Sequence, residues 1–154
     1  MKKLFIISLI FFLLQNCGYK PIYSKNQNIN FYIESLDFAG DNNELANFIK
    51  KDLQVYYKKK NDLGYKIKAK INYSKNPSSK NSSGEIVEYE LISDIEFVIK
   101  YKQINEKFNI REKFSINNFS DEFKEMQYER SIKQSMAKSV VSKLLLRLTR
   151  LNDN

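Results

Sequence analysis

Three lysines alternate with other residues in the stretch YKIKAKINY, which spans positions 65–73. Alternate side chains of a β-strand point to the same face at a spacing of about 7 Å, so Lys66, Lys68 and Lys70 share one face. Together with Arg111 and Lys113 they form a candidate anion-binding surface, because phosphates accept charge-assisted hydrogen bonds from ammonium and guanidinium groups. The same pattern is also typical of a solvated strand face or of an edge protected against aggregation.

Two pairs of carboxylates also stand at strand spacing, Glu88 with Glu90 and Asp94 with Glu96. Paired carboxylates can work as a general acid and base, as they do in glycoside hydrolysis. Acidic side chains next to a basic strand more often form cross-strand ion pairs, and we expect that arrangement here.

The chain has no histidine and one cysteine. An internal disulfide is therefore excluded, and the usual zinc ligands are missing. Triads that depend on histidine and the commonest general base are missing as well. The sequence predicts no catalytic residues, no metal site and no cofactor, and we expect a protein that is not an enzyme.

The single cysteine, Cys17, follows a charged and then apolar N-terminus. Lys2 and Lys3 precede the apolar run 4–14, which is too short for a membrane span of about 20 residues. This order of charge, short apolar core and processing site is typical of a secretory signal, so we expect residues 1–16 to be cleaved.

The residues Leu14-Gln15-Asn16-Cys17 resemble the lipobox of bacterial lipoproteins, in which a leucine stands three residues before an acylated cysteine. The resemblance implies that Cys17 is the lipid attachment site, and several acyl chains give lasting membrane attachment. Gly18 follows the cysteine, where an aspartate would imply retention in the inner membrane, so the resemblance points to the outer membrane.

The charge of the exported part favours anionic partners. Loss of Lys2 and Lys3 from the 26 basic residues leaves 24 against 18 acidic ones, a net charge of +6. Such a charge suits phosphorylated lipid or an acidic protein surface, and export argues against nucleic acid. The segment 17–28 is expected to be a lipidated tether before a single domain over 29–154.

Hydrophobic periodicity predicts four strands and two helices in this domain, with one long loop between the second and third strands. They are a strand over 29–38 with a bulge or two-sided burial, a helix over 42–60, a strand over 65–73, a mobile polar loop over 74–84, strands over 85–102 and 106–117 joined as a hairpin, and a helix over 120–151. The fold class is therefore α+β, a two-layer sandwich of a four-stranded sheet and two helices in the order β-α-β-β-β-α, with a parallel crossover between the first two strands.

The closing helix is expected to begin with Ser120 as its N-cap. Its apolar stripe predicts a face that packs on the sheet, with contact to a partner protein as the alternative. The stripe comprises Phe123, Met126, Ile132, Met136, Val140, Leu144, Leu148 and Leu151.

The segment Cys17-Gly-Tyr-Lys-Pro-Ile-Tyr23 resembles the start of the lipopolysaccharide-assembly lipoproteins, and the expected element order is similar over the whole mature chain. The resemblance implies an outer-membrane lipoprotein that plugs a large β-barrel lipopolysaccharide-export protein, helps that barrel fold and assists delivery of lipopolysaccharide to the outer leaflet. It places the domain in the periplasm or within the barrel lumen.

Two other functions remain open. The chain could be another small α+β outer-membrane lipoprotein, such as an accessory of barrel insertion or an envelope tether. It could also be an exported enzyme or small-ligand protein, but the sequence offers no convincing nucleophile, base or metal set.

Overall fold

The computed structural model describes residues 31–40, 43–57 and 64–152. Cys17, the expected signal peptide and the whole expected tether lie outside these residues, as do residues 29 and 30 of the predicted first strand. The order is β1 (Tyr32–Gly40), α2 (Asn43–Leu53), a 3₁₀ turn η2 (Gln54–Tyr56), β2 (Gly64–Lys80), β3 (Ile86–Tyr101), β4 (Ile104–Asn117) and α3 (Glu122–Asn152). The predicted α+β order β-α-β-β-β-α is confirmed.

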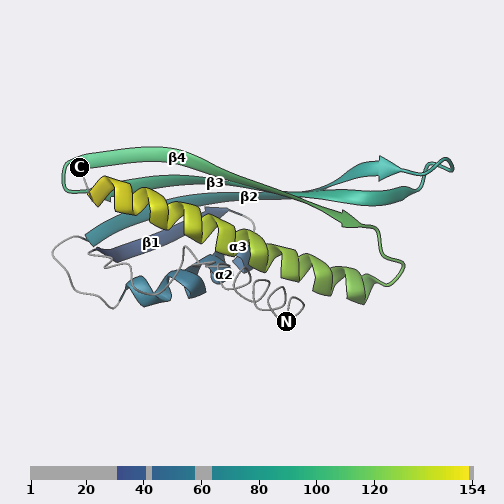
Figure 1. The fold of residues 1–154 in the computed structure, drawn as a ribbon, viewed down its shortest axis with the longest axis horizontal. Helices are drawn as coiled ribbons and strands as arrows, with labels where there is room; N and C mark the ends of the chain where they lie inside the picture. The colour runs from purple at the N-terminus through teal and green to yellow at the C-terminus, as the bar shows by residue number, and fades with distance from the viewer. Residues whose placement is uncertain (1–30, 41–42, 58–63, 153–154) are drawn as a thin grey trace, which may run out of the picture.

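The four strands form one sheet in the order β1-β2-β3-β4. β1 runs parallel to β2, which confirms the predicted crossover, and the other neighbours are antiparallel. Figure 1 shows both helices on the same side of the sheet, so the described residues form two layers and leave the other sheet face open.

The core lies between the sheet and the helices. In β2 the buried residues Tyr65, Ile67, Ala69 and Ile71 alternate with exposed lysines, as the sequence predicts. α3 contributes Met136, Val140, Leu144 and Leu148, all fully buried. Full burial of one such side chain stabilises the fold by about 2 kcal/mol, so this part of α3 is fixed by hydrophobic packing.

A bulge explains the irregular pattern of β1. The register with β2 shifts between Ile33 and Ser35, so that one extra residue, Glu34, stands between them. Ile33 and Leu36 are both buried although they are an odd number of positions apart. A bulge has this effect because it rotates the following side chains to the other face.

The predicted loop over 74–84 is wrong for most of its length. β2 continues to Lys80 and pairs with β3 as far as Ile86. Only the tip is a turn, in which Asn81 Oδ1 accepts the N–H groups of Ser83 and Glu85 and Gly84 has φ +83°. The polar composition reflects a hairpin arm with solvent on both faces, which Figure 1 shows projecting beyond the helices.

The helix ends also differ from the sequence predictions. α2 ends at Leu53 and tightens into η2, so the predicted helix over 42–60 is too long at its C-terminal end, and its residues 42 and 58–60 lie outside the described residues. α3 begins at Glu122, and Asp121 rather than Ser120 caps it. Asp121 Oδ1 accepts the N–H groups of Phe123 and Lys124, because a carboxylate there reaches the free donors of the first turn.

Candidate functional site

The five predicted cations lie on the open face of the sheet. Lys66, Lys68 and Lys70 are exposed along β2, and Arg111 and Lys113 are exposed along β4. β3 runs between the two groups, which places their backbones about 10 Å apart at the usual strand spacing. The structure therefore brings all five to one face but in two rows.

Acidic residues occupy part of the space between these rows. Lys113 Nζ contacts Glu90 at 2.9 Å, and Lys107 Nζ contacts Glu96 at 2.8 Å. Glu90 and Glu96 thus form the expected cross-strand ion pairs. Lys66 is also paired, since its ammonium group lies 3.2 Å from the carboxylate of Glu34.

Other cations on this face have no such partner. Within the described residues, Lys68, Lys70 and Arg111 form no ion pair, although Asp37 stands opposite Lys68 and Asp94 opposite Arg111 in the sheet register. Their exposed ammonium and guanidinium groups remain available for an anion. We call Lys68, Lys70 and Arg111 the open-face cations.

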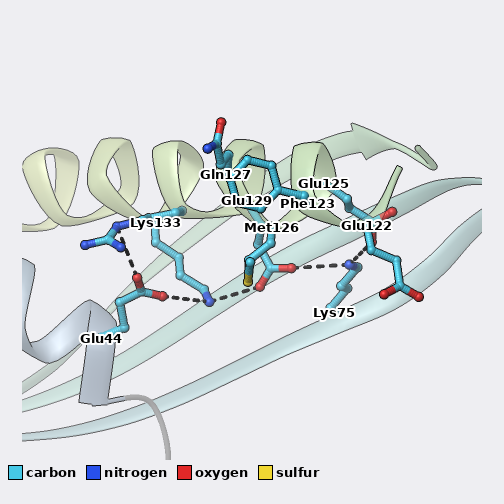
Figure 2. Close-up of a pocket in the computed structure, with 10 residues that line it drawn as sticks. Glu44, Lys75, Glu122, Phe123, Glu125, Met126, Gln127, Glu129 and Lys133 are labelled. Atoms are coloured by element: carbon cyan, nitrogen blue, oxygen red, sulfur yellow. Dashed lines mark hydrogen bonds and ion pairs between the residues drawn. The ribbon is translucent and has the colours of Figure 1, made fainter. Parts of the chain in front are cut away.

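A second polar cluster was missed by the sequence analysis. It joins α2, β2 and α3 beneath the first turns of α3, and Figure 2 shows its side chains in a row. Lys75 of β2 bonds to Glu125 and, at 3.2 Å, to Glu129. Lys133 continues the row to Glu129 at 3.0 Å and to Glu44 of α2 at 3.1 Å. We call these five residues the charge chain.

Burial and hydrogen bonding set the protonation of the charge chain. The hydrogen bond from Lys75 holds the pKa of Glu125 below its ordinary value. Burial favours a higher pKa for Glu129, but the hydrogen bonds from Lys133 and Tyr73 outweigh it and the pKa is lowered. Burial and the hydrogen bond from its hydroxyl to Glu129, 2.8 Å long, raise the pKa of Tyr73. Both carboxylates are therefore ionised at neutral pH.

The charge chain overturns part of the predicted apolar stripe. Phe123 and Met126 are 60% and 62% exposed, whereas Glu125, Glu129 and Lys133 face the sheet. The repeat of Glu125, Glu129 and Lys133 at intervals of four is the sequence signal that could have shown that these residues share one helix face. The rest of the stripe is correct, with Ile132 and Leu151 partly buried.

A groove of about 410 Å³ runs beside the charge chain. It lies between the first turns of α3, the side chain of Lys75 and the start of α2 (Figure 2). Glu122, Phe123, Met126 and Gln127 also line it. The groove thus combines two exposed apolar side chains with a row of paired charges.

Two general features of the described residues bear on the site. They contain no group of three or more Cys, Asp or Glu side chains that would hold a metal ion. No helix among them has the length and apolarity needed to cross a bilayer.

The fold is shared with solved structures of bacterial lipoproteins. Rare lipoprotein B from Shewanella oneidensis superposes with a TM-score of 0.57 at 13% identity, covering 76% of this chain and 98% of that one. Lipoprotein B from Nitrosomonas europaea gives 0.57 at 14% identity, over 81% and 88%. A minor lipoprotein from Acinetobacter baumannii gives 0.52 at 13% identity, over 77% and 94%.

At these identities the likeness concerns the fold. No protein-family model and no curated protein matches the sequence. The chain therefore has a two-layer α+β fold that is also found in bacterial lipoproteins.

Proposed function

We propose that this chain is an outer-membrane lipoprotein, anchored through acyl chains on Cys17, that plugs and helps assemble a large β-barrel lipopolysaccharide-export protein. In this role it assists delivery of lipopolysaccharide to the outer leaflet and catalyses no reaction. The observation that carries the proposal is the cysteine directly after a short apolar signal, on a chain whose domain has the fold of bacterial lipoproteins.

The open-face cations support the lipid part of the proposal. Lys68, Lys70 and Arg111 are exposed and have no ion pair within the described residues, and they suit the phosphates of a lipopolysaccharide head group. Arg111 offers a planar pair of donors that matches a phosphate, whereas the lysines act as point charges. The domain binds such a ligand from the periplasm or from within the barrel lumen.

The lipid anchor is tested by the change Cys17→Ser. Radioactive palmitate should label the unchanged protein, whereas the variant should be unlabelled, differ in mobility from the lipidated protein and leave the membrane fraction. A variant that stays on membranes without its label would contradict the anchor.

The barrel partner is tested by purification through a C-terminal tag from outer membranes in mild detergent. Mass spectrometry should identify one large β-barrel of the lipopolysaccharide-export type in near-equal amount. Recovery with barrel-insertion machinery would favour the second candidate, another small α+β outer-membrane lipoprotein that assists barrel insertion. Recovery of the lipoprotein alone would contradict both partner assignments.

A further inference from the structure

One edge of β2 carries no neighbouring strand over half its length. β1 pairs with β2 only as far as Gly40 opposite Ile71, and β2 then continues to Lys80. Its other edge pairs with β3 from Lys66 to Lys80. Among the described residues, no strand pairs with the edge of 72–80 that follows β1. Such an edge presents N–H and C=O groups that can pair with an added strand.

The groove described above lies beside this edge. Lys75, in the middle of the uncovered stretch, lines it from β2, and the first turns of α3 line it from above. Phe123 and Met126 are the exposed apolar residues of that helix face (Figure 2). A segment that pairs with β2 would therefore bring its alternate side chains against two apolar side chains, which is how strand addition gains specificity.

The charged residues that line the groove indicate which charged side chain the added segment carries. Glu44, Lys75, Glu125, Glu129, Arg130 and Lys133 are all engaged in ion pairs with one another. Glu122 is the charged lining residue for which the described part of the chain provides no partner. A lysine or arginine in the incoming segment would complement it.

The geometry points to an extended segment of another protein as the occupant of this edge and groove. The segment adds to β2 along 72–76, places apolar side chains on Phe123 and Met126, and directs a basic side chain to Glu122. β2 is regular only up to Pro77, after which its register with β3 shifts, so the added segment is confined to 72–76. This inference goes beyond the proposed function, because it requires neither lipopolysaccharide nor the barrel.

The chain's own N-terminal segment suits the groove less well. Phe31 lies next to Tyr32, which pairs with Gly64, so the segment would have to travel about 26 Å along β2 before reaching Asn72. Residues 17–30 span at most about 50 Å when fully extended, and an anchored Cys17 must also reach the membrane.

A second copy of the chain fits poorly as well. If residues 72–76 of two copies paired in antiparallel fashion, the pairing would be centred on Ser74 and would set Pro77 of one copy opposite Ile71 of the other. That place is next to the end of β1, because Gly40 pairs with Ile71. The residues from Pro77 to Lys80 would then run into the copy's β1.

The test uses the full chain in mild detergent and the synthetic peptide acetyl-Lys-Thr-Val-Thr-Val-Thr-amide as the probe, in which the lysine and both valines share one strand face. Fluorescence anisotropy should show saturable binding, and amide hydrogen exchange should slow at residues 72–76. The same peptide with its interior amides N-methylated should not bind, because it cannot form the ladder. The double change Phe123→Ser and Met126→Ser should weaken binding about tenfold or more, and Glu122→Lys should also weaken it.

Leu146→Ser is the matched control, since Leu146 is 56% exposed on the same helix but does not line the groove. It should leave the affinity unchanged. A dissociation constant above about 1 mM for the peptide overturns the inference, as does binding of the N-methylated peptide. Slow amide exchange at 72–76 in the absence of peptide, if deletion of residues 18–28 abolishes it, would show that the chain's own N-terminal segment occupies the edge and would also overturn the inference. A dimer detected by light scattering that dissociates in the Phe123 and Met126 variant would show that a second copy occupies it, with the same consequence. None of these outcomes depends on the barrel or on lipopolysaccharide.

Discussion

The ammonium group of Lys75 on β2 lies 3.2 Å from Oε2 of Glu129 on α3. Both side chains are largely shielded, at 26% and 17% exposure. Two to three turns further along α3 the same helix face is apolar and fully buried at Met136 and Val140. The helix is therefore held to the sheet by two kinds of contact, charged near its start and hydrophobic towards its end.

Removing the charge at Glu129 should destabilise the domain. The change Glu129→Gln leaves Lys75 and Lys133 without one of their carboxylates, in a shielded site where an unpaired charge is costly. We expect a loss of about 2 kcal/mol in the free energy of unfolding, measured by urea denaturation followed by circular dichroism. Glu88→Gln is the control, because Glu88 is part-exposed and its expected effect is within about 0.5 kcal/mol. Equal losses for both variants would contradict the structural role of the charge chain.

The same cluster predicts how stability depends on pH. The pKa values of Glu125 and Glu129 are lower in the folded protein than the ordinary value of 4.5. Their contribution to stability is therefore fully present above about pH 4.5 and is lost as the pH falls through the lowered values. The pKa of Lys75 is raised in the folded protein, so its contribution to stability is present below about pH 10.5 and is lost at higher pH.

Urea midpoints measured at a series of pH values below 5 test this prediction. The unchanged protein should lose stability steadily as the medium becomes more acidic. A variant with both Glu125→Gln and Glu129→Gln should start less stable and show a shallower decline. Parallel curves would mean that other carboxylates cause the acid sensitivity.

The sequence predicted the fold well where one face is apolar. The alternation in 65–73 and the apolar spacing of Met136, Val140, Leu144 and Leu148 gave the core directly, because burial selects side chains at the period of the element. The arm and the first turns of α3 were predicted wrongly for one reason. The arm is held by backbone pairing, and the first turns of α3 are held by ion pairs between residues far apart in sequence, such as Lys75 with Glu129. Hydrophobic periodicity carries no signal for either kind of contact.

The candidate site was predictable only in part, because the sequence shows which side chains share a strand face but not which strands are neighbours. The alternation of Lys66, Lys68 and Lys70 set them on one face, but their ion pairs depend on strand order. Glu34 reaches Lys66 because β1 lies beside β2, and Glu90 reaches Lys113 because β3 lies beside β4. Without that order, the sequence could not separate Lys68, Lys70 and Arg111 from the paired cations.

A buried hydroxyl offers a test of the core. Ser93 faces the helices from the middle of β3, is completely buried, and its Oγ has no hydrogen-bond partner among the described residues. Replacing it by alanine removes an unsatisfied polar group, so Ser93→Ala should leave stability unchanged or raise it by up to about 1 kcal/mol. Leu91→Ala, two residues away on the same face, should cost about 3 kcal/mol through loss of packing. A loss of more than about 1 kcal/mol for Ser93→Ala would show that the hydroxyl is bonded in solution.

The open-face cations should contribute more to anion binding than the paired ones. The double change Lys68→Gln and Lys70→Gln removes two ammonium groups without ion pairs in the described structure, and should weaken binding of purified lipopolysaccharide about tenfold or more. The matched double change Lys66→Gln and Lys113→Gln lowers the net charge equally but removes cations that Glu34 and Glu90 already hold, so we expect less than about a threefold effect. Surface plasmon resonance on the full chain in mild detergent measures both. Equal weakening by the two pairs would mean that net charge alone attracts the lipid, and the open face would then be a solvated surface rather than a site.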